Sequence, residues 1–125
     1  MKKCNKDIGD YGENLCKDYL TSIGYKILDE KFKIKTGEID LIAIDKNILC
    51  FIEVKSRFNN KFGRPMEAVT IAKQHKIYKT AQYYLLKHPN LDDMNCRFDV
   101  IEVDFDLEKS SHKINLIKNA FSVNY

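Results

Sequence analysis

The 125-residue chain lacks any apolar run long enough to cross a membrane. Its first residues, Met-Lys-Lys-Cys-Asn-Lys-Asp, also lack the apolar segment of a signal peptide. Together these absences favour a cytoplasmic protein with no membrane partner. The chain contains neither internal repeats nor low-complexity tracts, and its length suits one domain spanning residues 1–125 around one core.

The chain has few cysteines, and none of them forms a C-x-x-C pair. They are scattered at Cys4, Cys16, Cys50 and Cys96. A zinc site or a disulfide framework needs closely spaced or paired cysteines, so this pattern argues against both. Cys16 and Cys50 fall within predicted apolar faces, where we expect each to pack as a small hydrophobe.

The net charge is small, because 21 basic residues face 18 acidic ones to give +3. A protein that coats DNA is usually more basic, so total charge alone does not indicate nucleic-acid binding. The basic residues nevertheless gather in clusters near the central strands, at Lys31-Lys33-Lys35, Lys55-Arg57, Lys61-Arg64 and Lys73-Lys76-Lys79. Each cluster fits either a phosphate-binding surface or an ordinary solvated one.

Two apolar, isoleucine-rich runs dominate the first half of the chain. Residues 37–45 and 48–55 each read as a strand buried on both faces, and the polar residues between them fit a hairpin turn. We therefore expect the two strands to pair in antiparallel fashion.

Four charged residues interrupt these runs: Glu38, Asp40, Glu53 and Lys55. Side chains two residues apart on a strand share a face, about 6.6 Å apart, so Glu53 and Lys55 project together. Antiparallel pairing places Asp40 beside Glu53. Two carboxylates suit a hard cation such as Mg²⁺, and a neighbouring ammonium suits the handling of a water molecule. The alternative is a buried ion pair that only fixes the strand register.

The remaining pattern gives the order α-β-β-β-α-β-β. Apolar spacing predicts a helix over about 7–23, ended by Gly24, and an edge strand over 25–35 with alternating lysines. Residues 58–65 read as a loop that suits contact with a sugar-phosphate backbone. Thr70 is the expected N-cap of a helix that runs to about Lys87, with Pro89 just beyond it. A polar loop over 90–95 leads to a strand over 97–105 that can lie parallel to the Glu53 strand. A weaker strand is expected over 113–117.

The sequence also resembles a known family. Asp40 followed by Glu53-Val54-Lys55 looks like the signature of the PD-(D/E)-x-K nucleases, with Ile39 standing where their name has proline. Residues 37–43 and 51–57 resemble more narrowly the YraN-like family of small bacterial proteins, which is similar to archaeal Holliday-junction resolvases. The resemblance runs from Gly12-Glu13 to Arg97-Phe98-Asp99 and implies a restriction-endonuclease-like α/β sandwich with a central mixed sheet.

The resemblance implies a Mg²⁺-dependent (or Mn²⁺-dependent) endonuclease acting on DNA, with branched or junction DNA as one candidate substrate. Asp40, Glu53 and the carbonyl of Val54 would hold the metal, and Lys55 would position the attacking water. Glu13 matches an acidic residue on the first helix of the resolvase-like relatives, although an ordinary surface glutamate also fits that position. Glu38 is a possible accessory, or it pairs with a nearby lysine.

The expected nucleic-acid contacts are Arg57, Lys61, Arg64, Lys73 and Gln74. Gln74 and Tyr78 have the Q-x-x-x-Y spacing of exonuclease-type relatives, an element short enough to arise by chance. Resolvase-like relatives work as symmetric dimers, so a homodimer is implied here too, although the apolar pattern marks no dimer surface. The two rival interpretations are a nucleic-acid-binding protein with the fold but little or no turnover, and a structural protein with an ion-pair network.

Overall fold

A computed structural model describes residues 5–58, 69–106 and 108–123 of the chain. The elements follow the order α1 (Asn5–Ser22), β1 (Lys26–Ile34), β2 (Gly37–Asp45), β3 (Ile48–Phe58), α2 (Ile71–Lys87), a short 3-10 turn (Pro89–Leu91), β4 (Asn95–Asp106) and β5 (Ser111–Phe121). The predicted order α-β-β-β-α-β-β is confirmed. None of the helices in the described ranges is long and apolar enough to cross a membrane.

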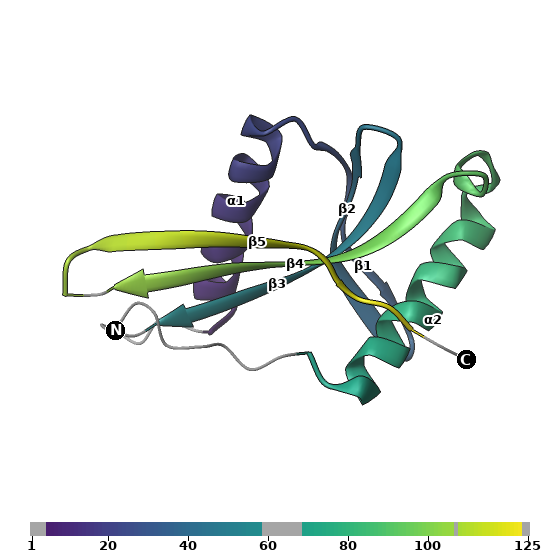
Figure 1. Cartoon of the computed structure of the whole chain (residues 1–125). Helices are drawn as coiled ribbons and strands as arrows, with labels where there is room; N and C mark the ends of the chain where they lie inside the picture. Colours follow the sequence, from purple (N-terminus) through teal and green to yellow (C-terminus); the bar gives the residue numbers. More distant parts are fainter. Residues whose placement is uncertain (1–4, 59–68, 107, 124–125) are drawn as a thin grey trace.

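The five strands form one mixed sheet in the order β1-β2-β3-β4-β5. Every neighbouring pair is antiparallel except β3 and β4, which are parallel and connected through α2. The two helices cover opposite faces of the sheet (Figure 1). This is the expected α/β sandwich, consistent with a restriction-endonuclease-like arrangement.

The hairpin of β2 and β3 forms the centre of both cores. On the α1 side, Cys16 and Leu20 pack against Leu41, Cys50 and Ile52. On the α2 side, buried residues of the helix pack against the alternate residues of the same strands; this second cluster includes Ile42, Leu49, Phe51, Ile77, Ala81 and Tyr84. Burial on both faces is confirmed, and so is the packing of Cys16 and Cys50 as buried hydrophobes.

The predicted stop of α1 and the predicted N-cap of α2 are both confirmed. Gly24 adopts a φ of 101°, and the Tyr25 amide reaches back to the Leu20 carbonyl at 2.9 Å, which closes α1 at a left-handed residue. The Thr70 hydroxyl accepts a hydrogen bond from the Lys73 amide at 3.2 Å and so caps α2.

Three predicted boundaries are wrong. Phe58, expected in a loop, belongs to β3, because it pairs with Phe105 of β4 and the two rings stack at 4.4 Å. β4 starts at Asn95 rather than Arg97, after the 3-10 turn within the expected loop. The last strand is longer than the predicted 113–117, because the 12-residue β4 offers a ladder partner along most of its length.

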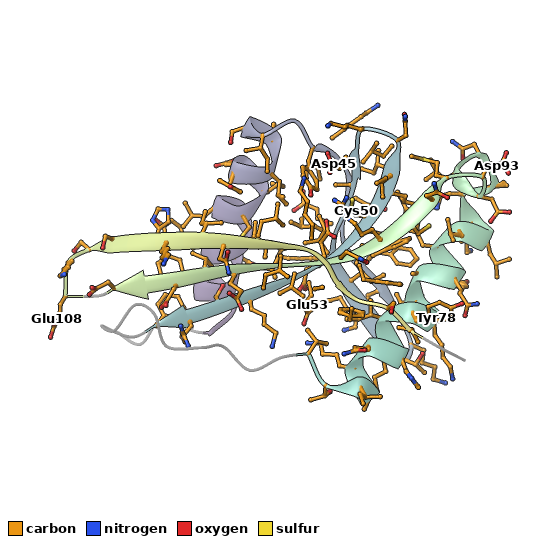
Figure 2. The ribbon with its side chains drawn as sticks, in the orientation of Figure 1. Asp45, Cys50, Glu53, Tyr78, Asp93 and Glu108 are labelled. Carbon is orange, nitrogen blue, oxygen red and sulfur yellow. The ribbon has the colours of Figure 1, made fainter. Side chains whose placement is uncertain are left out.

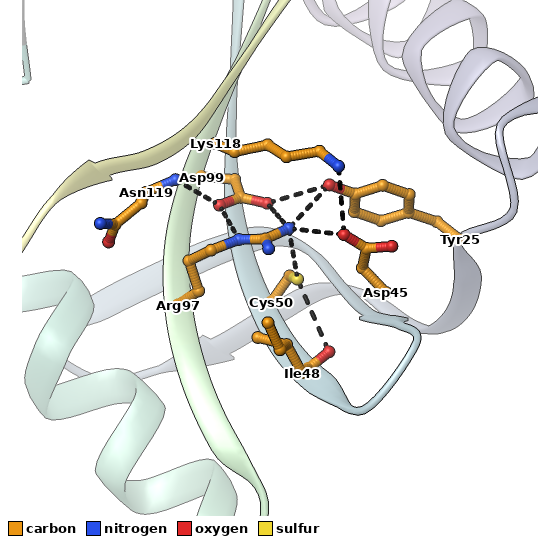
Figure 3. Close-up of polar contacts among 8 residues, drawn as sticks. All are labelled: Tyr25, Asp45, Ile48, Cys50, Arg97, Asp99, Lys118 and Asn119. Atoms are coloured by element: carbon orange, nitrogen blue, oxygen red, sulfur yellow. Dashed lines mark hydrogen bonds and ion pairs between the residues drawn. The ribbon is translucent and has the colours of Figure 1, made fainter.

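A polar network ties together the end of the sheet nearest the β2–β3 turn (Figure 3). The Arg97 guanidinium donates to Asp99 at 2.7 and 2.9 Å, to Asp45 at 3.0 Å and to the Tyr25 hydroxyl at 2.9 Å. Asp99, fully buried, also accepts from the Asn119 amide at 2.9 Å. The network joins the residue before β1 to β2, β4 and β5, so one half-buried guanidinium stabilises the arrangement of distant segments.

Candidate active site

Asp40 and Glu53 lie where the pairing of β2 and β3 comes to its end. The ladder runs from Asp45 opposite Ile48 to Leu41 opposite Ile52, and these two acids follow directly. The Val54 amide donates a hydrogen bond to Asp40 Oδ2 at 2.8 Å, so a side chain rather than a strand carbonyl satisfies it. The predicted neighbourhood of the two carboxylates is therefore present, and Figure 2 shows Glu53 near the centre of the molecule.

The electrostatic state of Asp40 reflects this crowding. Burial, followed by the charge of Glu53, raises the pKa of Asp40 to about 8, although the Val54 hydrogen bond acts in the opposite direction. Glu53 is itself only 6% exposed. Two adjacent carboxylates, one buried and one half-buried, favour a shared proton or a bound cation, because their charges repel each other in these surroundings.

Lys73, on the first turns of α2, supplies one such compensation through an ion pair with Glu53. Partial burial acts to lower the pKa of Lys73, but the hydrogen bond and charge of Glu53 outweigh it, and that pKa is raised. The sequence analysis expected Lys73 to contact nucleic acid, and nothing in the sequence indicated that Glu53 would be its partner.

Glu13 approaches the same region from α1. The preceding Gly12 packs so closely on the sheet that a Cβ there would lie 2.3 Å from Ser56 Oγ. Glu13 is 8% exposed, and its Oε1 has no hydrogen-bond partner among the described residues. Burial raises the pKa of Glu13, and Lys31, 3.8 Å from Oε2, only partly offsets this.

A pocket of about 370 Å³ opens over these groups. Asp40, Glu53 and the exposed Glu38 lie on its strand side, whereas Lys73 and Lys76 line it from α2. The turn residue Thr36 was not predicted as a site residue, and Lys76 was named only as part of the basic cluster Lys73-Lys76-Lys79. The spacing of Lys73 and Lys76, three residues apart on one helical face, was the available signal.

The donor set suits a hard divalent cation better than a soft one. The described residues contain no group of three or more His, Cys, Asp or Glu side chains arranged to hold a metal. Mg²⁺, however, keeps several waters and commonly takes only one or two protein carboxylates. Asp40 and Glu53 meet that requirement, and the partnerless Glu13 oxygen adds an unused acceptor nearby. The residues present therefore fit Mg²⁺ or Mn²⁺.

The other predicted site residues are dispersed. Lys55 is partly buried on β3, two residues beyond Glu53, and does not line the pocket. Arg57 pairs with Asp104 at 2.8 Å. The Gln74 side chain donates to the Val69 carbonyl at 2.9 Å, a local contact next to the helix start. Lys61 and Arg64 lie outside the described residues.

Comparison with known proteins gives one consistent result. The model of a family described as "Uncharacterised protein family UPF0102" matches residues 12–103. A UPF0102 protein of Clostridium botulinum (strain Kyoto / Type A2) is 50% identical over 123 residues, covering 98% of this chain and 100% of its own length. A UPF0102 protein of Clostridium perfringens (strain 13 / Type A) has the same identity and coverage.

Proposed function

The chain belongs to the uncharacterised UPF0102 (YraN-like) family, and we propose that it is a Mg²⁺-dependent phosphodiester hydrolase that cuts DNA. The observation that carries the proposal is the pairing of a half-buried Asp40, whose pKa is raised, with the buried Glu53 in a pocket bordered by lysines. A structural ion pair does not need two adjacent carboxylates. Perturbed acids in a pocket are instead common at catalytic sites.

In this proposal Asp40, Glu53 and the Val54 carbonyl would hold the cation, with Glu13 available to a second cation or a water. When bound, the cation supplies positive charge to the scissile phosphate and lowers the pKa of a nearby water. Lys55 orients the attacking water from its position along β3. Lys73, which is paired with Glu53 in this structure, would be available to a phosphate oxygen where a cation neutralised Glu53 instead.

The second candidate is a nucleic-acid-binding protein with little or no turnover. The Lys73–Glu53 ion pair favours it, because an ammonium already neutralises one carboxylate of the pair. In that case the pocket recognises phosphate without needing a cation. Its partners would be the same, since the lysines around the pocket suit a DNA backbone in either case. The predicted cytoplasmic location and homodimer stay predictions.

The decisive experiment incubates the purified protein with four-way junction, nicked, duplex and single-stranded DNA in Mg²⁺, Mn²⁺ or EDTA. We expect cleavage of at least one DNA in a divalent cation and its loss in Asp40→Asn. Asp18→Asn, which removes an exposed carboxylate on α1, is the matched control and should cut normally. Binding without cleavage by the wild type would instead support the second candidate.

A further inference from the structure

A second groove, of about 570 Å³, lies between the edge strand β1 and the C-terminal half of α2. Phe32, Lys33 and Lys35 line it from the strand side, and Tyr83 and Lys87 line it from the helix. The acidic pair does not reach this groove. Its lining combines lysines with aromatic rings and contains no carboxylate.

This groove adjoins the pocket over Asp40 and Glu53. Thr36 lines both cavities. Lys73, Lys76, Thr80, Tyr83 and Lys87 recur every three or four residues and so form one stripe along α2. The stripe spans about 21 Å at 1.5 Å per residue.

Gly37, which follows Thr36, packs directly against α2. A Cβ at Gly37 would lie 2.4 Å from Thr80 Oγ1 and 3.2 Å from the Lys76 carbonyl oxygen. The turn before β2 thus touches the middle of the helical stripe. Lys73 and Lys76 border the acidic pocket, whereas Tyr83 and Lys87 border the second groove.

The lysines of the second groove form no ion pair within the described part of the chain: no carboxylate there pairs with Lys33, Lys35 or Lys87. Glu38 stands opposite Lys33 in the strand register, but it lines the neighbouring pocket instead. The groove therefore offers three cations to an anionic ligand.

The aromatic residues add a flat apolar surface among these cations. Tyr83 is 38% exposed, with the Lys87 ammonium 5.3 Å from its ring centre and the Phe32 ring 6.4 Å away. Proteins that bind single strands combine a cationic groove with exposed rings on which bases stack. A duplex cannot use such rings in the same way, since its base faces are already stacked.

We propose that this groove binds a single-stranded segment of nucleic acid that continues from the strand whose phosphate enters the acidic pocket. The inference rests on the proposed function and adds the substrate class: DNA with an unpaired tail or flap next to the cut. Tyr83 stacks on a base, and Lys33, Lys35 and Lys87 face phosphates.

The test measures binding of fluorescent oligothymidylates by anisotropy in EDTA, where no cleavage interferes. Tyr83→Ala should weaken binding roughly 5- to 150-fold, the usual range for a lost base stack, and Tyr83→Phe should restore it. Lys35→Ala/Lys87→Ala should make the dependence of log affinity on log salt shallower by about 1.4, which is about 0.7 for each phosphate contact on a single strand. Melting temperatures check that each variant folds.

Lys26→Ala is the matched control, because it removes an exposed lysine at the far end of the same strand. It should change the salt dependence by less than the groove variants do. Wild-type binding by Tyr83→Ala and by the double lysine variant would overturn the inference, whatever the protein cuts. Polyglutamate that competes as well as an oligothymidylate of equal charge would also overturn it, and would point to an acidic protein ligand.

Cleavage assays separate this inference from the proposed function. If the protein is a nuclease that uses the groove, the variants should cut tailed duplexes more slowly and blunt duplexes normally. Groove-dependent binding without any metal-dependent cleavage would support the groove while removing the nuclease proposal. The opposite result is metal-dependent cleavage at equal rates for tailed and blunt DNA, in the wild type and in the variants. It would support the nuclease proposal and overturn the proposal that the groove binds a single strand.

Discussion

Asp40 and Asp45 belong to the same strand, β2, yet their surroundings have opposite electrostatic effects. Burial and the neighbouring Glu53 raise the pKa of Asp40 to about 8. Burial alone would also raise the pKa of Asp45, but hydrogen bonds from Arg97 and Lys118 outweigh it and lower that pKa. Half of one strand therefore stabilises a carboxylate, and the other half destabilises one.

This difference separates the charges that stabilise the fold from those that form the candidate site. Around Asp45, each charge faces an opposite one, and the buried Asp99 has partners for both oxygens. Around Asp40, carboxylates from β2, β3 and α1 gather, and a Glu13 oxygen lacks a partner among the described residues. Such a cluster lowers stability in isolation, which is the expected cost of a site that must receive a ligand.

The largest expected effect concerns Lys55, and it tests whether the acidic cluster is catalytic. Lys55→Ala should lower the cleavage rate by about 10²–10⁴, the usual contribution of a positioned acid–base group, with little change in metal binding. The cleavage rate and the melting temperature are measured together. A variant that melts early would assign Lys55 to the fold, and a well-folded variant that still cuts at the wild-type rate would leave it without a catalytic role.

Arg97 tests the opposite region, where we expect a purely structural effect. Arg97→Met removes the partner of the buried Asp99 and should cost about 3–5 kcal/mol of unfolding free energy, as measured by urea denaturation. Lys118→Ala is the control, because its pair with Asp45 is half exposed and should contribute at most about 1 kcal/mol. Similar small losses in both variants would show that the network stabilises the fold far less than its burial indicates.

Asp40 itself gives a pH test in the absence of metal. Because its folded pKa lies above the unfolded value, the native state holds more protons between about pH 4 and 8, and the free energy of unfolding falls as pH rises through that window. The slope is at most about 1.4 kcal/mol per pH unit. Asp40→Asn should flatten it and stabilise the metal-free protein near pH 8, as measured by chemical denaturation across the range.

Asp45→Asn is the matched comparison and should have the opposite sign. The lowered pKa of Asp45 stabilises the fold above the unfolded pKa, and this contribution is lost as pH falls through the folded pKa. The variant should therefore be less stable than wild type at pH 7. If both asparagine variants were destabilised at pH 8, the two halves of β2 would have the same structural role, and the contrast between them would fail.

The sequence was most informative where local patterns determine position. Two nearly continuous apolar runs and a short polar turn were sufficient to predict the central hairpin and the approach of Asp40 to Glu53, which is 13 residues later. The resemblance added the role assigned to Glu13, which its position alone left open.

Contacts between distant segments could not be predicted in this way. Arg97 meets Asp45 only after three intervening elements have folded, and no local spacing reports that pairing. The ion pair of Lys73 with Glu53 depends on where α2 settles on the sheet, and helical periodicity fixes only a face. The groove beside β1 likewise needs an edge strand and a helix placed together, although its lysines were visible as a sheet-edge pattern.

The smallest expected effect concerns Lys73, which stands between the two interpretations of the acidic pocket. In EDTA its ammonium is paired with Glu53, so Lys73→Ala should change the salt dependence of duplex DNA binding little. With Mg²⁺ present, in the Lys55→Ala background to prevent cutting, Lys73 is released toward phosphate. The same substitution should then make the slope of log affinity against log salt shallower by about one unit.

Lys79→Ala, on an exposed position that lines neither cavity, controls for the lost charge. A slope that changes equally with and without Mg²⁺ would mean that Lys73 meets phosphate without giving up Glu53 to a cation, which would favour the DNA-binding protein over the nuclease.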